Sequence, residues 1–413
     1  MSETNPPRLL PAVTVLGMGA DGWAGLSTVQ QQIVLDARVV LGGHRHLALI
    51  PPRRGQVRQP WPSPLREHLP AMLEHLDSAG TTGAEIVALA SGDPLVFGIG
   101  STLIELLGPE RVRIIPALSS IALARAELGW SAQSCAVVSV VGRDPAAVLR
   151  ELAPGRRVLV LSADESTPQL VAELLRDCGY GASRMHVLGD LGTTDFSRTE
   201  ALAAGWEGPA ARLNIIGLEL VGPTHGGWVA GLPDDLFEHD GQLTKRDLRA
   251  SALARLAPVP GEHLWDVGAG AGSVGIEWMR AHPSCTATAI EAVPERAARI
   301  ARNAAALGVP ALRVVLGQAP QALTGLPEPS AIFVGGGASA PGVMARCLSA
   351  LPAGGRLVVH GVTLETERLL GELYAQHGGE LTRIAVEIAA PIGSYTGWTP
   401  ARAVTQWALT RPR

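Results

Sequence analysis

Short apolar runs rich in β-branched residues alternate with segments of helical periodicity from residue 12 to about residue 221. This alternation is typical of α/β folds with largely parallel sheets. The rhythm pauses between Trp130 and Ser134, so we expect two subdomains that divide near residue 130. The predicted strands are Val13–Leu16, Arg38–Leu41, Ile86–Ala90, Val112–Ile115, Ala136–Val141, Val158–Leu161, Met185–Leu188 and Leu213–Leu220.

The same alternation resumes after residues 223–241, where glycine, proline, aspartate and histidine interrupt the pattern. This composition is typical of a linker, so we expect one domain over residues 1–222 and another over residues 242–413. Predicted helices there are Lys245–Leu256 with Thr244 as N-cap, Ser273–Arg280, and one that begins at Pro294 and ends before Gly308. The predicted strands are His263–Val267, Thr286–Ile290, Arg313–Leu316, Ala331–Val334 and Arg356–Val359, followed by an antiparallel edge pair near Leu381–Ile388 and Ala403–Leu409.

Composition and charge narrow the class of protein. A chain of 413 residues exceeds what one hydrophobic core usually organises, and 46% hydrophobic with 17% charged residues is an ordinary globular composition. A net charge of −4 argues against nucleic-acid binding, which needs a concentrated basic surface. The four cysteines are widely spaced, which favours reduced thiols and gives no zinc motif. Without a leader-like or membrane-spanning apolar run, we expect a cytoplasmic protein.

A glycine-rich loop, Asp266 to Gly272, lies between the predicted strand that begins at His263 and the predicted helix from Ser273. Glycines allow a backbone to approach a ligand closely, and a helix N-terminus offers unpaired N–H groups. Glu291 ends the next predicted strand, where a carboxylate can accept both ribose hydroxyls of a nucleoside. The loop is therefore a candidate nucleoside site.

The spacing of Gly268, Gly270 and Gly272 differs from the Gly-x-Gly-x-x-Gly pattern of dinucleotide sites. Asp266 at the start of the loop would repel a pyrophosphate but suits the amino group of a methionine tail. These residues favour S-adenosylmethionine over NAD. Gly335 and Gly336, after a later strand, open space beside such a donor and offer N–H groups.

Three strings, Gln242 to Ala250, Leu264 to Ser273 and Ile332 to Gly336, resemble the decarboxylating corrin-ring methyltransferases of the CbiT type. The resemblance covers roughly residues 240–413 and implies a Rossmann-like class I methyltransferase fold. One departure is Gln318, where the family usually has aspartate, although an amide can still hydrogen-bond adenine. Together with the loop chemistry, the residues implied for donor binding are Thr244, Asp266, Gly268, Ala269, Gly270, Ala271, Gly272, Glu291, Gln318 and Ala319.

In the N-terminal half, Gly17 to Gly22 matches a dinucleotide fingerprint, but the next strand ends without an acid for a ribose. The Ser91-Gly92-Asp93-Pro94 string is more informative. It permits a sharp turn in which Asp93 can accept hydrogen bonds and Pro94 fixes the backbone.

Five strings in this order resemble the tetrapyrrole methylases of the CbiE type, over residues 12 to about 222: Gly17 to Gly19, Gly42 to His46, Ala88 to Gly100, Pro116 to Ser120 and Val141 to Arg143. Ala117 and Ser27 depart from the usual glycine and threonine. The resemblance implies a two-lobed class III fold that binds a folded donor between α/β lobes. The implied donor residues are Gly17, Gly92, Asp93, Pro94, Phe97, Gly98, Ser119 and Ser120.

Basic residues in these loops are candidate clamps for substrate carboxylates, because arginine can bind them through two hydrogen bonds. The candidates are Arg45, Arg143, Lys245 and Arg246, with Gly335 and Gly336 beside them. Lys245 and Arg246 could equally start a helix. His44 and His46 lack a third ligand, so we expect no metal. The sequence identifies no catalytic residue.

The two halves, in this order, resemble the fused methyltransferases of aerobic cobalamin biosynthesis. The resemblance implies two S-adenosylmethionine sites, a tetrapyrrole substrate, and conversion of precorrin-6B to precorrin-8X by methylation at ring carbons 5 and 15 with loss of the ring C acetate carboxylate. Alignment of an activated sulfonium with electron-rich carbons can supply much of the rate. We also expect a homo-oligomer.

Three alternatives remain open at this stage. They are a dinucleotide-dependent oxidoreductase, a regulatory module that binds the donor without turnover, and a methyltransferase acting on nucleic acid or another small molecule through the C-terminal domain alone.

Overall fold

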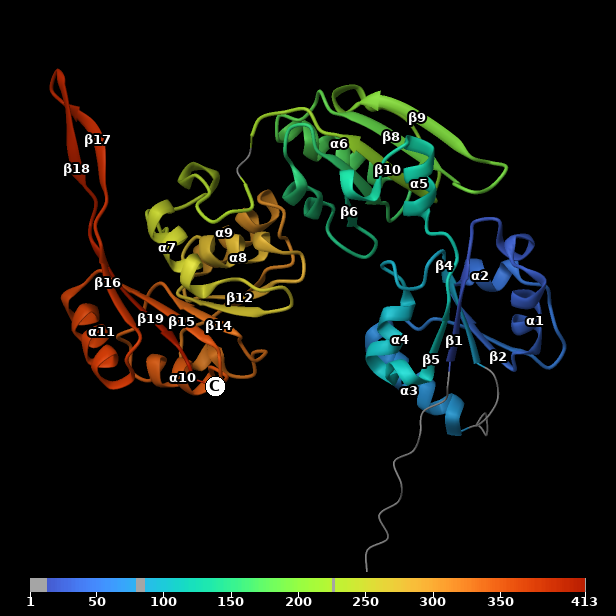
Figure 1. The fold of residues 1–413 in the computed structure, drawn as a ribbon, viewed down its shortest axis with the longest axis horizontal. Helices are drawn as coiled ribbons and strands as arrows, with labels where there is room; N and C mark the ends of the chain where they lie inside the picture. Colours follow the sequence, from blue (N-terminus) through green and yellow to red (C-terminus); the bar gives the residue numbers. More distant parts are fainter. Residues whose placement is uncertain (1–12, 79–85, 225–226, 413) are drawn as a thin grey trace, which may run out of the picture. The chain divides into compact units, whose positions relative to one another are not determined.

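A computed structural model of the chain describes residues 13–78, 86–224 and 227–412. Residues 1–12, on which the expectation about a leader rests, lie outside these ranges. The contacts divide the chain into two compact units (Figure 1): the first contains residues 1–141, 156–172 and 182–219, and the second contains residues 142–155, 173–181 and 220–413. Across the described ranges, every helix is too short or too polar to cross a membrane.

The first sheet of the first unit is entirely parallel, with strand order β3-β2-β4-β1-β5. Helices α3 (Leu65–Ser78) and α4 (Ile99–Leu107) contribute to the core on one side, and α1 (Thr28–Asp36) and α2 (His44–Leu49) border the other. The strands are β1 (Val13–Met18), β2 (Val39–Gly42), β3 (Val57–Pro60), β4 (Ile86–Ser91) and β5 (Val112–Ile115). β1 and β4 are almost fully buried, as expected for parallel strands covered on both faces.

The second sheet has the order β6-β7-β10-β8-β9, and only β6 and β7 pair in parallel. The prediction of largely parallel sheets is therefore wrong here, because β8 and β9 are joined by a short loop that can link only antiparallel neighbours. The elements are β6 (Cys135–Ser139), β7 (Arg157–Leu161), α6 (Thr167–Asp177), β8 (Arg184–Gly189), β9 (Ser197–Leu202) and β10 (Asn214–Glu219).

Helix α5 (Ser120–Leu128) connects the two sheets along the chain. Its Ile121 and Ala124 pack in one core cluster with Leu159 of β7 and Leu188 of β8. The chain therefore passes from the first sheet to the second before α5. Residue 130, near which the sequence pattern pauses, follows that helix.

The second unit is built on a seven-stranded sheet with order β13-β12-β11-β14-β15-β19-β16. Helices α7 (Arg246–Leu256), α8 (Ser273–Ala281) and α9 (Pro294–Ala306) share a core with one face, and α10 (Val343–Ala350) and α11 (Leu364–His377) share one with the other. The strands are β11 (His263–Val267), β12 (Thr286–Glu291), β13 (Arg313–Leu316), β14 (Ala331–Val334), β15 (Arg356–Gly361), β16 (Glu380–Ile384) and β19 (Val404–Thr410). The antiparallel β16–β19 pair confirms the prediction for the tail.

Two local predictions in this unit are corrected. The N-cap of α7 is Lys245, without a side-chain cap, while the carbonyl of Thr244 accepts a hydrogen bond from the Arg249 side chain. The apolar run predicted from Leu381 to Ile388 is split, because β16 ends at Ile384 and a separate hairpin begins at Glu387. The hairpin strands β17 (Glu387–Ile392) and β18 (Tyr395–Pro400) project from the β16–β19 edge (Figure 1).

Candidate functional sites

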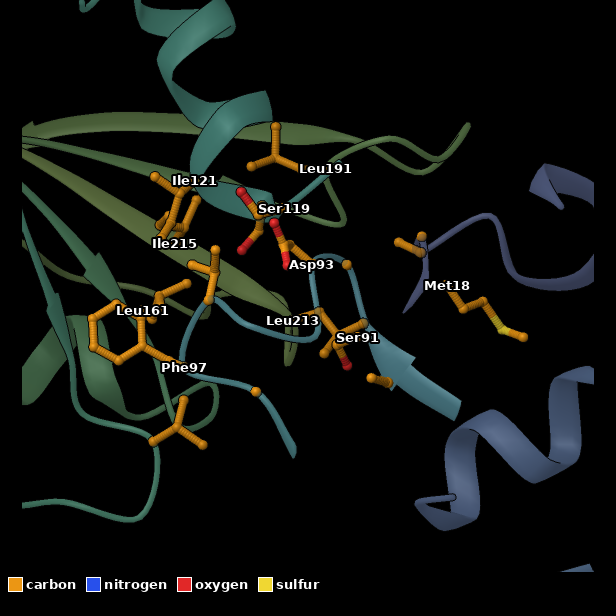
Figure 2. Close-up of a pocket in the computed structure, with 18 of the residues that line it drawn as sticks. Met18, Ser91, Asp93, Phe97, Ser119, Ile121, Leu161, Leu191, Leu213 and Ile215 are labelled. Atoms are coloured by element: carbon orange, nitrogen blue, oxygen red, sulfur yellow. The ribbon is translucent and has the colours of Figure 1, made fainter. Parts of the chain in front are cut away.

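The first unit contains a cavity of about 410 Å³ at the carboxyl ends of β1 and β4 (Figure 2). Met18 and Ser91 reach it from the first sheet, and Leu161 and Ile215 reach it from the second. The carboxyl ends of parallel strands are where α/β folds usually bind ligands. We call this space the first cavity.

The Gly92–Gly98 loop enters the first cavity in a conformation that depends on its glycines. A Cβ atom on Gly17 would lie 2.0 Å from the carbonyl oxygen of Gly92, and one on Gly98 would lie 2.5 Å from that of Pro94. Gly92 N–H donates to the carbonyl of Met18 at 2.8 Å. Gly17 and Pro94 therefore shape the loop from behind without lining the cavity.

Asp93, Phe97 and Ser119 all line the first cavity (Figure 2). Asp93 Oδ1 accepts a hydrogen bond from Leu95 N at 2.9 Å, which leaves capacity on the carboxylate for a ligand. Phe97 has φ of +54°, a conformation that non-glycine residues rarely adopt. Ser119 is the N-cap of α5, with Oγ accepting from Ala122 N at 3.2 Å.

Most of the residues predicted for this site are brought together. Those that line the first cavity are Arg45, Gly92, Asp93, Phe97, Gly98, Ser119 and Ser120. Arg143 is not among the lining residues. Their roles in donor and substrate binding remain predictions.

Sequence reasoning missed a small polar cluster in the first cavity. His46 Nε2 lies 3.1 Å from Ser91 Oγ and 3.1 Å from Arg45 Nη2. Burial, helped by the Arg45 charge, lowers the pKa of His46 to about 4, so the imidazole is neutral at physiological pH. The two partners His46 and Ser91 are 45 positions apart in the sequence, and only the strand order brings them together.

The second unit contains a larger cavity, of about 1070 Å³, at the carboxyl ends of β11, β12, β14 and β15. The strand order reverses between β11 and β14, which is where doubly wound sheets usually bind ligands. We call this space the second cavity. The predicted residues that line it are Thr244, Lys245, Arg246, Gly268, Ala269, Gly270, Glu291, Gln318, Ala319, Gly335 and Gly336.

Glu291 holds the glycine loop in place from the end of β12. Its Oε2 accepts from Gly270 N at 2.8 Å and its Oε1 accepts from Val293 N at 3.1 Å. Each carboxylate oxygen has a second lone pair, so Glu291 retains the capacity to accept ribose hydroxyls. Gly270 has φ of +59°, and a Cβ atom there would lie 2.7 Å from the carbonyl oxygen of Gln242.

Asp266, Ala271 and Gly272, at the two ends of the glycine loop, are buried and are not among the lining residues. Asp266 Oδ2 accepts from Gly275 N at 2.9 Å, while its Oδ1 has no partner among the described residues. Burial raises the pKa of Asp266 to about 7; the Gly275 hydrogen bond opposes this and the Glu291 charge adds to it. The proposed contact of Asp266 with a donor remains a prediction.

Residues 231–248, which we call the strap, form one wall of the second cavity and overlap the segment with linker composition. Arg249 is fully buried and its Nε lies 2.5 Å from Glu277 Oε1. Glu277 also accepts from the backbone N–H groups of Gly231 and Leu232, at 2.6 and 2.9 Å. Leu232 and Phe237 are buried in the core of this unit. Sequence reasoning missed this anchor because its two charges are 28 positions apart.

Several basic side chains line the second cavity. Lys245 lies 3.7 Å from Asp234, and Arg246, Arg296 and Arg402 are also lining residues. Lys245 both caps α7 and lines the cavity, so the two alternatives for this residue are compatible. Over residues 13–78, 86–224 and 227–412, no group of three or more histidine, cysteine, aspartate or glutamate side chains is arranged to hold a metal.

His360, at the end of β15, also lines the second cavity and was not predicted. Its Nε2 lies 2.9 Å from the amide of Gln406 on β19. Burial lowers the pKa of His360, so the ring is neutral at physiological pH. No sequence pattern links this pair, because only the β15–β19 register brings the two residues together.

Comparison with known proteins assigns each half to a family. Residues 12–204 match the family described as tetrapyrrole (corrin/porphyrin) methylases, and residues 235–411 match the precorrin methyltransferase domain. These matches confirm the two predicted folds.

Three relatives extend this result. The chain is 46% identical to a Sinorhizobium precorrin-6Y C(5,15)-methyltransferase [decarboxylating], over 100% of this chain and 99% of that protein. A Salmonella typhimurium cobalt-precorrin-7 C(5)-methyltransferase is 32% identical over 43% of this chain and 84% of its own length. A cobalt-precorrin-6B C(15)-methyltransferase (decarboxylating) from the same organism is 35% identical over 31% of this chain and 67% of its own length. The chain therefore belongs to the precorrin-6Y C(5,15)-methyltransferase (decarboxylating) family of cobalamin biosynthesis.

Proposed function

We propose that the two halves divide the reaction between them. The first cavity holds one S-adenosylmethionine for methylation at ring carbon 5. The second holds another for methylation at carbon 15 and is where the ring C acetate loses its carboxylate, so that precorrin-6B becomes precorrin-8X. The observation that carries this proposal is the presence of two cavities in separate compact units, each bordered by its own glycine-dependent loop. The two Salmonella relatives, named for one step each, support the division.

The domains that we assign are residues 1–222 and 242–413, joined by residues 223–241, of which the part from residue 231 onward also belongs to the strap. In each methyl transfer, the bond from sulfur to methyl breaks as the ring carbon's electron pair forms the new bond, S-adenosylhomocysteine leaves, and the ring system then gives up a proton to solvent. In the decarboxylation, carbon dioxide leaves, its bonding electrons pass into the conjugated ring, and the remaining methylene carbon takes a proton. The ring and the sulfonium supply the reactivity, so the protein chiefly aligns them, and no metal is required.

In the first cavity, Asp93 and the N-terminal residues of α5 would contact the donor, and Arg45 would bind a substrate carboxylate. In the second, Glu291 would accept the ribose hydroxyls, and Gln318 with Ala319 would border the adenine. Lys245 and Arg246, which line this cavity, would bind carboxylates of the tetrapyrrole. Gly335 and Gly336 leave room for the ring beside the methyl group.

The test counts products. The purified chain with precorrin-6B and labelled S-adenosylmethionine should transfer two methyl groups and release one carbon dioxide per substrate. Asp93→Arg places a cation in the first cavity and should remove methylation at carbon 5 only. Gly270→Val should remove the steps at carbon 15 and the ring C acetate, while Gly205→Ala, in open space, should change nothing.

If one step must precede the others, a single variant also stops the later steps, even when the two sites are independent. Mixing the Asp93→Arg and Gly270→Val chains distinguishes this case from one site that serves all the steps. Each variant retains one intact cavity, so the mixture should restore the full product. Failure of the mixture to form the doubly methylated product would contradict two independent sites.

We further propose that the chain acts in the cytoplasm as a homo-oligomer. Its four cysteines are free thiols, which suits a reducing compartment. The β17–β18 hairpin is a two-stranded sheet that presents Tyr395 at 81% and Trp398 at 69% exposure. A second copy of the chain could cover these side chains and pair with the free strand edges.

A further inference from the structure

His360 is placed to contact a ligand in the second cavity. It lies at the carboxyl end of β15, next to β14, which leads into the Gly335–Gly337 loop. Its ring packs edge-on against Phe333, with ring centroids 5.0 Å apart. The imidazole is therefore held between a buried aromatic ring and the cavity.

The Gln406 amide fixes the orientation of the hydrogen bond to His360. The hydrogen-bonding groups around the Gln406 amide all have a suitable partner when the amide oxygen accepts from Arg255 Nε at 3.1 Å and from Ser251 Oγ at 3.3 Å. The amide nitrogen then donates to His360 Nε2 at 2.9 Å. The opposite orientation would place the amide N–H groups against the guanidinium, where two donors face each other.

This arrangement determines the tautomer of the ring. Because Nε2 of His360 accepts a hydrogen bond, the proton of the neutral imidazole is on Nδ1. Within the described residues, Nδ1 has no hydrogen-bond partner, and the residue lines the second cavity. His360 thus offers an uncharged N–H donor to whatever occupies this space.

We propose that His360 Nδ1–H donates a hydrogen bond to the ring C acetate carboxylate that is lost, with Gln406, Arg255 and Ser251 as positioning residues. This inference rests on the proposed assignment of decarboxylation to the second cavity. A neutral donor orients a carboxylate but stabilises its charge less than arginine would, and the charge must disappear as carbon dioxide forms. The proton that the methylene carbon takes comes from water, so His360 keeps its own.

The two amide substitutions of His360 provide a matched test. Asn places an N–H near the position of Nδ1, whereas Gln places one near that of Nε2. His360→Ala and His360→Gln should each lower the rate of carbon dioxide release about 10- to 100-fold, the usual effect of losing a hydrogen bond to a charged group. His360→Asn should stay within a few-fold of the unmodified chain. His282→Asn, at a half-buried histidine outside the cavity, should have no effect.

A positioning role for Gln406 has its own signature. Gln406→Glu can only accept from the ring, so it should move the proton to Nε2 and slow carbon dioxide release as much as His360→Ala does. Nitrogen-15 spectra of histidine-labelled chain should show an Nδ1–H tautomer that disappears in His360→Asn and converts to Nε2–H in Gln406→Glu. A purely structural role would leave this tautomer signal unrelated to the rate.

Binding of S-adenosylhomocysteine to the second cavity should be unchanged in all these variants, which reports an intact fold. Normal carbon dioxide release by His360→Ala, equal losses in the Asn and Gln variants, or an Nε2–H tautomer in the unmodified chain would overturn the role of His360. If a His360 variant lost methylation at carbon 5 and released carbon dioxide normally, this result would instead overturn the assignment of reactions to the two halves.

Discussion

Asp266 makes the stability of the second unit depend on pH. Its folded-state pKa is raised to about 7 from an ordinary value of 3.8, so the native chain keeps a proton that the unfolded chain releases in this window. Stability should therefore fall as pH rises between these values, by roughly 1.4 kcal/mol per pH unit, with the loss complete above about pH 7. Asp266→Asn keeps an oxygen for the Gly275 N–H but cannot ionise.

Asp266→Asn and the unmodified chain should differ in how their stability changes with pH. The free energy of unfolding of Asp266→Asn relative to the unmodified chain should increase steadily from pH 5 to pH 7 and then level off. Calorimetry of the second unit's transition at several pH values measures this. Asp235→Asn, an exposed control, should show no such trend; parallel pH profiles for Asp266→Asn and the unmodified chain would contradict the raised pKa.

The Arg249–Glu277 pair also acts at the scale of single residues. Arg249→Met would leave the Glu277 carboxylate buried without its counter-charge, which typically costs about 3–5 kcal/mol. The exposed Arg368–Glu372 pair, with side chains 82% and 52% exposed, is the matched control, and Arg368→Ala should cost less than about 1 kcal/mol. Urea unfolding measures both. Equal costs would show that burial of the Arg249 pair has no energetic consequence.

At the scale of elements, the strap links the stability contributed by the Arg249–Glu277 pair to the shape of the second cavity. Glu238 and Asn303 join the strap to α9 through Glu238 N to Asn303 Oδ1 at 2.9 Å and Asn303 Nδ2 to Glu238 O at 3.0 Å. Arg296 adds an ion pair to Asp240 at 2.9 Å. Because the strap lines the second cavity, loosening it through Arg249→Met should also weaken S-adenosylhomocysteine binding there without affecting the first cavity.

The hairpin gives a prediction about assembly. Isolated two-stranded sheets are marginally stable in water, so apolar side chains on β17 and β18 need a cover. If a second copy provides it, Tyr395→Ser with Trp398→Ser should lower the molar mass measured by light scattering towards that of one chain. Val229→Ser, which removes another exposed apolar side chain, should leave the mass unchanged. An unmodified chain that is already monomeric would contradict the proposal.

An element can be predicted from the sequence when its own residues determine it, and cannot when its pairing with another strand does. Strands β1, β4, β11 and β14 are buried apolar runs, so their sequence alone indicates them. β9 is exposed along nearly its whole length and carries no apolar period, so its pairing with β8 could not be predicted.

The same distinction applies to the sites. Glycine loops can be recognised because their glycines cluster within a short string, although the backbone that they approach is distant in the sequence, as Gly92 is from Gly17. The His46–Ser91 and His360–Gln406 pairs are separated by 45 and 46 positions. Only the strand order brings these partners together, which is why the sequence did not reveal them.

At the scale of the whole molecule, two donor sites in separate units should bind independently. A saturating titration with S-adenosylhomocysteine, followed by calorimetry, should give two equivalents per chain. Gly17→Ala should remove one, because its Cβ would lie 2.0 Å from a backbone oxygen of the Gly92 loop. Gly270→Val should remove the other, because its Cβ would meet the carbonyl of Gln242 at 2.7 Å.

Each single variant should keep the remaining site at unchanged affinity, since additivity is expected for sites that share no residues. Gly205→Ala and Gly371→Ala are matched controls, because a Cβ at either position has nothing within 4 Å, and both should bind two equivalents. A single equivalent in the unmodified chain, or a loss of both sites from one substitution, would mean that the two cavities do not each hold a donor, and the division of the reaction between the halves would fail with them.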